Sequence, residues 1–281
     1  GTGTIRLETE AAGGTITGGG QITAASLGAR TNNGVVTLNN ALNDVNTFAA
    51  ATSGGTVTFV DADGVDIGTV TAAGTGPLFA QVDGVDTGAG NFTLTAGGDV
   101  TQTQAITTTA LTVLTKNDTV GGGEITLTNA ANNAATIDLQ AMNVANNAAV
   151  DSDIKYTDVS GFGVTKITTA GDVQLTNGGA VTQTGTIESA GLLLLGTNSY
   201  TLTNAANAVT TIAANTGGEI QFVDANSLTV GSVLGTTGIT TSNDDVLLTA
   251  TTGNLTITDL MNVGTGTIRL ETEAAGGTIT G

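Results

Sequence analysis

The sequence has no cysteine, no histidine and no tryptophan among its 281 residues, and its single proline is Pro77. Without cysteine there can be no disulfides, zinc ribbons or thiol chemistry. Without histidine the commonest general base and metal ligand is missing. Aromatic residues make up only 3% of the chain, so the apolar 39% is mostly Val, Ile, Leu and Ala. Such residues predict a thin, uniform core, which suits a narrow stack of short strands better than a wide globule.

Basic residues are also scarce, because six Lys and Arg stand against 24 Asp and Glu and give a net charge of −18. A surface this acidic repels nucleic acid and anionic lipid, and it favours solubility and association with cations. No apolar run approaches the roughly 18 residues that a membrane helix needs. We therefore expect no nucleic-acid partner and no membrane span.

One long repeat organises the chain. Residues Gly1 to Gly18 read GTGTIRLETEAAGGTITG, and residues Gly264 to Gly281 read the same without a change. The sequence thus restarts after 263 residues, which indicates a longer tandem array. We expect residues 1–263 to form one repeat unit and residues 264–281 to begin the next identical one.

A looser repeat lies inside this unit. The string VTLNNALN at Val36 returns as ITLTNAAN at Ile125 and YTLTNAAN at Tyr200, and VTFVDAD at Val57 returns as IQFVDAN at Ile220. FTLTAGGDVTQT and VQLTNGGAVTQT form a further pair, starting at residues 92 and 173. The unequal spacing of these copies indicates that whole coils have been gained or lost, which a stacked solenoid tolerates.

Short runs of three to five aliphatic residues alternating with Thr recur along the chain, separated by Gly and Asn pairs. This pattern is typical of strands with one buried face, joined by tight turns. Two such runs take up roughly twenty residues, so we expect an all-β solenoid of about 20 residues per coil and about 13 coils per unit. Nothing indicates a helix, and the Ala-rich stretch from Ala130 to Ala149 is expected to be a bulge or loop. Four Asn residues are expected to stack in ladders at corners: Asn129, Asn132, Asn204 and Asn207.

These strings resemble the repeat region of filamentous-haemagglutinin-like exoproteins, large surface proteins of Gram-negative bacteria that are exported by two-partner secretion. The resemblance covers essentially the whole chain. It implies a right-handed parallel β-helix in a secreted or cell-surface filament. Proteins of that family include adhesins, biofilm matrix proteins and toxins that are carried on such stalks. The N-terminal secretion domain of the family is not in this sequence, so the export route is implied only.

The strongest metal-site candidate is the set Asp61, Asp63 and Asp66, which resembles half of a calcium loop around Gly64. The usual distal bidentate Glu is missing, and the related stretch Asp224 to Ser227 has lost two of the acids. A polar turn is therefore the preferred interpretation. The acids of Asp83 to Asp86 and of Asn243 to Asp245 are interpreted in the same way.

Paired acids for sugar hydrolysis are a second possibility, because Arg6, Glu8 and Glu10 alternate on one strand and recur as Arg269, Glu271 and Glu273. An exposed charged ladder explains them more simply. The glycines at residues 18–20 and 121–123 lack the Lys and helix of a phosphate loop and indicate turns. The Thr runs at residues 101–103 and 182–184 are too irregular for an ice-binding face. No catalytic, cofactor-binding or metal-binding residue is assigned.

The sequence thus predicts a non-catalytic structural segment of a long extracellular filament or stalk that gives length and stiffness for adhesion or matrix formation. Its expected partners are further copies of the repeat, rods lying alongside it, and a host or neighbouring cell surface. One alternative is an adhesin repeat that binds glycans or calcium along its side. Tandem immunoglobulin-like domains and a β-helical polysaccharide lyase or hydrolase remain less favoured, the former because such domains usually need a bulky aromatic core.

Overall fold

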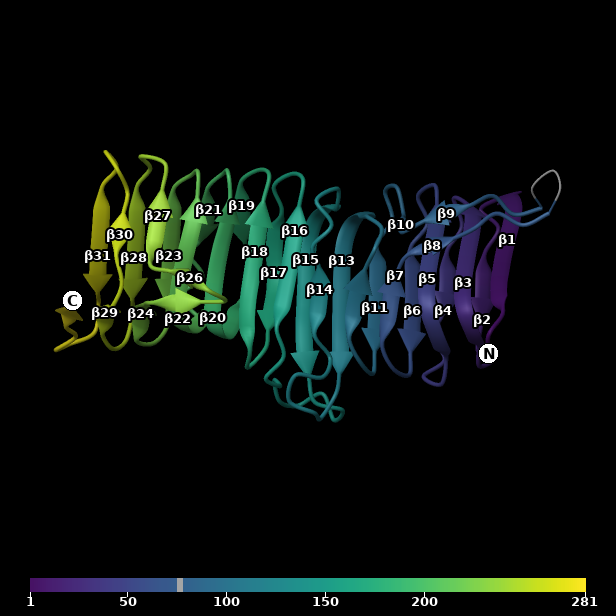
Figure 1. Cartoon of the computed structure of the whole chain (residues 1–281), viewed down its shortest axis with the longest axis horizontal. Helices are drawn as coiled ribbons and strands as arrows, with labels where there is room; N and C mark the ends of the chain where they lie inside the picture. The colour runs from purple at the N-terminus through teal and green to yellow at the C-terminus, as the bar shows by residue number, and fades with distance from the viewer. Residues whose placement is uncertain (75–77) are drawn as a thin grey trace.

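The computed structural model describes residues 1–74 and 78–281, and Pro77 lies outside the described residues. Within these ranges there are 32 strands and no helix. Twenty-eight strands form one sheet with parallel pairings, and the other four form two antiparallel pairs, β8 with β9 and β25 with β26. Figure 1 shows the strands wound into coils that stack along the long axis, with the two chain ends at opposite ends. The chain is a parallel β-solenoid, as the sequence predicts.

The strands fall into four groups by length. The longest are β1 (Thr4–Ala12), β3 (Thr23–Asn32), β5 (Asp44–Thr52), β13 (Ile106–Lys116), β15 (Asn133–Met142), β20 (Ile187–Gly196) and β22 (Ala208–Thr216). Those of intermediate length are β6 (Val57–Asp61), β11 (Phe92–Ala96), β16 (Ile154–Asp158), β17 (Gly163–Thr168), β18 (Asp172–Asn177), β23 (Ile220–Asp224), β28 (Val246–Ala250) and β31 (Ile268–Thr272).

The short strands have three residues or two. Those of three residues are β2 (Ile16–Gly18), β4 (Val36–Leu38), β7 (Val65–Ile67), β12 (Val100–Gln102), β14 (Ile125–Leu127), β19 (Val181–Gln183), β21 (Tyr200–Leu202), β24 (Leu228–Val230), β27 (Ile239–Thr241) and β29 (Leu255–Ile257). Those of two residues are β8 (Thr69–Val70), β9 (Val82–Asp83), β10 (Val85–Asp86), β25 (Ser232–Val233), β26 (Thr236–Thr237), β30 (Met261–Asn262) and β32 (Ile279–Thr280).

The pairing register gives the coil length. Partners on neighbouring coils are 20 residues apart at Ile16 and Val36, and 19 apart at Val181 and Tyr200. Four steps are longer because a segment between the paired strands leaves the coil, and we call such a segment an excursion. One excursion lies between β6 and β11 and contains β8 and β9. Excursions add residues without adding a turn. The repeat unit therefore winds through fewer coils than the about 13 expected from a uniform coil of about twenty residues.

Strand length differs from the expectation of three to five residues, because seven strands have nine to eleven. These long strands continue through a corner and pair on two faces. In β13, Ile106 pairs with Val85 of β10, whereas Leu111 pairs with Phe92 of β11. The inward alternation shifts by one residue where the strand bends: in β13, Thr108 and Leu111 are buried, with Thr109 exposed and Ala110 half-buried between them.

The interior is one continuous apolar column, since side chains of Val, Ile and Leu alternate inward on every face. The few aromatic residues are concentrated there as well. Phe48 and Phe59 are fully buried and stack with ring centroids 4.3 Å apart, and Tyr156 and Tyr200 are also fully buried. The core is thus less uniform than the composition predicts.

The stretch from Ala130 to Ala149 is only partly the loop that we expected from the sequence. β15 occupies Asn133–Met142, and its inward residues Ala134, Leu139 and Ala141 are fully buried. Loop residues follow only after Met142. Alanine suits the interior of a narrow coil, although its low β-propensity does not indicate a strand.

Glycines at one corner allow the coils to stack closely. A Cβ atom on Gly34 would lie 1.8 Å from the carbonyl oxygen of Gly14, and one on Gly55 would lie 1.9 Å from that of Gly34. Gly90 approaches Gly55 in the same way at 2.4 Å. We call Gly14, Gly34, Gly55 and Gly90 the glycine column. Backbone from one coil occupies the space that a side chain of the next would need.

Two antiparallel hairpins lie on the outside of the solenoid (Figure 1). In the β8–β9 hairpin, Phe79 and Val70 pack against Ala49 of β5. In the β25–β26 hairpin, Val233 packs against Leu193 and Ala213 of β20 and β22. Each hairpin closes at its base through a glycine pair: the amide of Gly84 donates to the carbonyl of Gly68, and that of Gly238 to Gly231, both at 2.8 Å. The coil therefore passes beneath each hairpin with its path unchanged.

Candidate functional site

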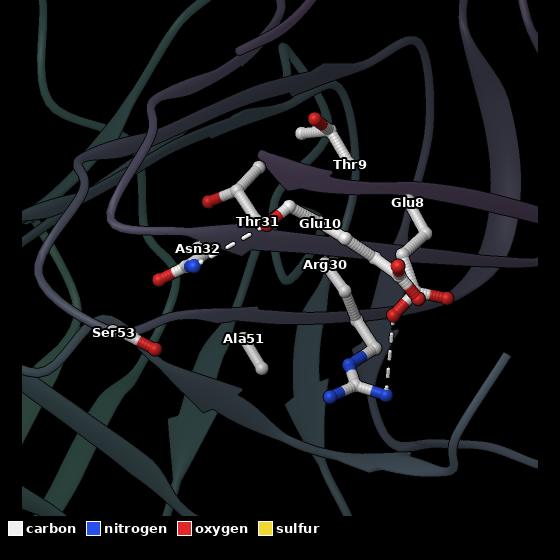
Figure 2. A pocket seen from close by; sticks show the side chains of 8 residues that line it. All are labelled: Glu8, Thr9, Glu10, Arg30, Thr31, Asn32, Ala51 and Ser53. Carbon is white, nitrogen blue, oxygen red and sulfur yellow. Dashed lines mark hydrogen bonds and ion pairs between the residues drawn. The ribbon is translucent and has the colours of Figure 1, made fainter. Parts of the chain in front are cut away.

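A shallow depression crosses β1, β3 and β5 near one end of the solenoid (Figure 2). Its lining residues are Glu8, Thr9, Glu10, Arg30, Thr31, Asn32, Ala51 and Ser53. Arg30 forms an ion pair with Glu8 at 3.4 Å and lies over the ring of Phe79, 6.0 Å from its centroid. The amide of Asn32 donates to the carbonyl oxygen of Glu10 at 3.3 Å. The only two carboxylates of this lining come from one strand.

This geometry does not favour sugar hydrolysis at Glu8 and Glu10. That reaction needs two carboxyl groups that flank the scissile bond, one of them held protonated. Here both belong to β1, two residues apart, and Glu8 already has a cationic partner. Arg6 donates to the carbonyl and the hydroxyl of Thr71 at 2.9 and 3.2 Å, so it attaches the β8–β9 excursion to β1. In the second copy of this segment, Arg269 pairs instead with Glu271 at 3.0 Å.

The residues Asp61 and Asp66 have different hydrogen-bond partners. Asp61 is buried and accepts backbone amides from Val45 and Asp63, at 3.0 and 3.2 Å. Asp66 accepts the hydroxyls of Thr101 and Thr103 at 3.1 and 2.9 Å, whereas the side chain of Asp63 is exposed. In residues 1–74 and 78–281 no group of three or more His, Cys, Asp or Glu side chains is arranged to hold a metal ion.

The other acidic turns hold backbone or polar side chains. Asp83 accepts the hydroxyl of Thr69 at 2.7 Å and the amide of Gln81 at 3.0 Å, and these hydrogen bonds lower its pKa. Asp245 accepts the backbone amide of Thr267 on the next coil at 2.7 Å. These contacts are those of polar turns.

The most highly organised polar groups lie at buried corners. Asn207 is fully buried, and its side-chain nitrogen donates to the carbonyls of Leu202 and Val223 at 3.2 and 2.9 Å. Its oxygen accepts the backbone amide of Ile187 at 2.9 Å. Ile187 lies on the preceding coil and Val223 on the following one. One side chain thus fixes three consecutive coils.

The same contacts recur at two other corners. Asn132 bonds Leu127, Thr157 and Ile106 in this way, and Asn43 bonds Leu38, Val60 and Ile22. All three asparagines are fully buried. Because a buried amide or carbonyl without a partner is costly, each asparagine satisfies backbone groups that the corner removes from the sheet.

An aspartate on the coil above completes each corner. Asp61, Asp158 and Asp224 are buried, and one carboxylate oxygen of each accepts the backbone amide two residues after the asparagine: Val45, Ala134 and Val209, at 3.0, 2.9 and 2.8 Å. The other oxygen accepts the backbone amide of the residue two positions after the aspartate, which is Asp63, Ser160 or Asn226, at 3.2, 2.8 and 2.8 Å. Tyr156 also donates its buried hydroxyl to Asp158 at 2.5 Å.

A glutamine on the coil below completes two of the three corners. Gln183 donates to the oxygen of Asn207 and accepts the amide of Asn204 at 3.1 Å. Gln102 does the same for Asn132, and it accepts the amide of Asn129 at 3.2 Å. We call each Gln, Asn and Asp set a corner cassette; the cassette of Asn43 has no glutamine. The strings VTQT and TLTNAAN, which each occur twice, contain the glutamine and asparagine, and the aspartate lies in FVDA at Asp61 and Asp224 and in YTD at Asp158.

The predicted asparagine ladders are therefore wrong in detail. Asn132 and Asn207 do lie at corners and bond along the axis, but their partners are glutamine and backbone groups. Asn129 and Asn204 instead accept the amides of Ala131 and Ala206 in local turns, each at 2.9 Å. The sequence reasoning also missed the aspartates. Their signal was present, since both FVDA strings follow an asparagine of the TLTNAAN type, Asn43 and Asn207, by one coil.

Burial shifts the pKa of two aspartates of the corner cassettes, Asp61 and Asp224. It raises the pKa of Asp61 to about 7, with a further contribution from the carboxyl of Asp63, and it also raises the pKa of Asp224. The unfolded chain loses the Asp61 proton near the ordinary value of 3.8, whereas the folded chain keeps it to about 7. The contribution of protonated Asp61 to the stability of the fold is therefore fully present below pH 4 and is lost as the pH rises to about 7.

We expect the guanidinium midpoint of Asp61→Asn, relative to the unchanged protein, to rise between pH 4 and pH 7 and then to level off. Asp83→Asn is the matched control, because an exposed acid with a lowered pKa affects stability only below about pH 4. A difference between Asp61→Asn and the unchanged protein that stays constant from pH 4 to pH 7 would contradict this assignment.

Comparison with known proteins gives one match. Residues 145–216 match a family described as repeats of unknown function, DUF5649. The matched segment runs from the loop after β15 to the end of β22 and includes Gln183 and Asn207. No curated protein and no solved structure matches the chain. The structure and this match together define the class as a repeat-containing parallel β-solenoid. No helix in residues 1–74 and 78–281 has the length and apolar character for crossing a membrane.

Proposed function

We propose that this chain is a non-catalytic structural segment of a long secreted or cell-surface filament, to which it gives length and stiffness. The observation that carries the proposal is the repeated first coil. Residues 1–18 support the coil above them through β1 on β3 and β2 on β4. The identical residues 264–281 lie on the coil below them through β31 on β28 and β32 on β29. One sequence thus fits both edges of the stack.

The polar groups of the chain support a structural role. The buried Asn and Asp side chains bond backbone of neighbouring coils, and Arg6 and Arg30 attach an excursion to the coil surface. A continuous core with parallel pairing along the axis resists bending, because every coil is hydrogen-bonded to the coils above and below. The likeness of its motifs to filamentous-haemagglutinin-like repeats is consistent with a Gram-negative surface protein that is used for adhesion or matrix formation.

Electron microscopy of chains with one, two and three consecutive units tests this function. We expect thin rods whose length grows by roughly 54 Å per unit, from a coil spacing of about 4.8 Å. Antibody labelling of intact cells that produce the native protein should mark the surface. Separate beads joined by linkers, or labelling only after lysis, would contradict the proposal.

A further inference from the structure

The pairing register shows that the repeat unit does not contain a whole number of coils. Two paths of paired residues can be followed from one end of the stack to the other. The first starts at Ile5 of β1 and passes through Leu27 and Phe48 to Ile67 of β7. From Val65, also in β7, it continues through Val100, Ile125, Ile154 and Val173 to Leu192 of β20. From Leu194, also in β20, it continues through Ala214 and Ile239 to Met261 of β30. After eleven steps, β1 therefore lies beneath β30.

The second path starts at β2. From Ile16 it passes through Val36, Val57, Phe92, Leu111, Ile137 and Val164 to Gln183 of β19. From Val181, also in β19, it continues through Tyr200, Ile220 and Val246 to Ile268 of β31. After eleven steps, β2 lies beneath β31. By sequence, however, β31 is the copy of β1 and not of β2.

The two paths agree on the size of this shift. The last complete coil has three strands, β28, β29 and β30, and β31 begins the next coil above β28. Each coil here has three faces, one for each of these strands. The copy of β1, which is β31, therefore lies eleven coils above β1 and one face further around the coil. The sequence period thus exceeds eleven turns by about a third of a turn.

We propose that each unit joins the next copy of itself in the same chain through the end surface of the coil, with an offset of about one third of a turn. This inference rests on the proposed function. The surface that joins is formed by Ile5, Leu7 and Ile16, which are only partly buried and pack on the end of the core. Its partner is the surface of β28 and β29 of the preceding copy, on which the same three side chains already lie as Ile268, Leu270 and Ile279.

The offset determines how the outer hairpins are displayed. If units were in phase, the β8–β9 hairpins of all copies would lie along one side of the rod, and the β25–β26 hairpins would likewise form a single line. With a shift of one face per unit, successive copies present them in three directions, and the pattern returns after three units, roughly 160 Å. A rod of this kind exposes its hairpins on every side to neighbouring rods or to a cell surface.

Cryo-electron microscopy of a chain with three consecutive units tests the offset, with the β25–β26 hairpins as markers. We expect successive hairpins to be about 120° apart around the axis, after subtraction of the strand twist measured within one unit of the same map. A straight rod with its hairpins in a single line would overturn the offset and leave the filament function intact. Separate compact bodies would overturn both.

A deletion variant provides the control. Removing Ser232–Thr237 from every unit shortens the sequence period by six residues, and the bases of this hairpin, Gly231 and Gly238, are already hydrogen-bonded at 2.8 Å. Because the deleted residues lie outside the coil path, the β8–β9 hairpins should keep the spacing of about 120°. A changed offset in this variant would show that residue count, rather than pairing register, sets the phase, and would overturn the inference.

Discussion

Replacing Asn207 by alanine is expected to lower the free energy of unfolding by about 4 kcal/mol, because it leaves two buried backbone groups and one half-buried one without a partner, at about 1–3 kcal/mol each. These groups are the amide of Ile187 and the carbonyls of Leu202 and Val223. Guanidinium denaturation measures the loss. Amide hydrogen exchange should also show Ile187 losing its protection, which places the effect at this corner.

The matched control is Asn226→Ala, which removes the same side chain from an exposed position on the coil above. The side chain of Asn226 makes no hydrogen bond to residues 1–74 or 78–281, since only its backbone amide is engaged, with Asp224. We expect its stability to change by less than about 0.5 kcal/mol. Equal losses in the two variants would show that the corner cassette does not carry the stability assigned to it.

The second large effect is expected at the glycine column. Gly55→Ala places a Cβ atom 1.9 Å from the carbonyl oxygen and 2.5 Å from the carbonyl carbon of Gly34. Both are backbone atoms, so no side-chain rotation can relieve the clash, and the two coils must move apart. We expect a loss of about 3 kcal/mol in the free energy of unfolding.

Gly19→Ala is the control for this substitution. A Cβ atom on Gly19 would have nothing within 4 Å, and the backbone there is not in the left-handed region. The variant should be as stable as the unchanged protein or slightly more so, because alanine restricts the unfolded chain. Similar denaturation midpoints for Gly55→Ala and Gly19→Ala would show that the coils are not stacked as closely as the backbone indicates.

The fold was predictable from the sequence, and the cassette only in part. Alternating runs such as Val57 to Asp61 specify strands with one buried face, and the absence of helix signals leaves a solenoid as the simplest way to cover them. Asn207 was correctly placed at a corner. The other members of its cassette, Gln183 and Asp224, were not found, because they come near this corner only after the chain has completed a turn in each direction.

The coil number shows a different limit. The assumption of a uniform coil of about twenty residues does not distinguish residues of the coil from residues of an excursion. Both outer hairpins have the same Thr- and Val-rich composition as the coils. Gly68 and Gly84 close the β8–β9 excursion only through a hydrogen bond between them. The phase of the repeat depends on which residues the coil path omits, and the pairing of Val57 with Phe92 and of Val65 with Val100 shows this for the β8–β9 excursion.

Distances between spin labels on one face test the central claim of parallel coils most directly. The chain has no cysteine, so pairs can be introduced at outward positions, with one label fixed at Thr37 of β4. Asp138, Thr201 and Leu247 lie four, seven and nine coils further along the same path. At about 4.8 Å per coil we expect separations of roughly 19, 34 and 43 Å. Separations that do not increase in this order with the number of coils would contradict the account.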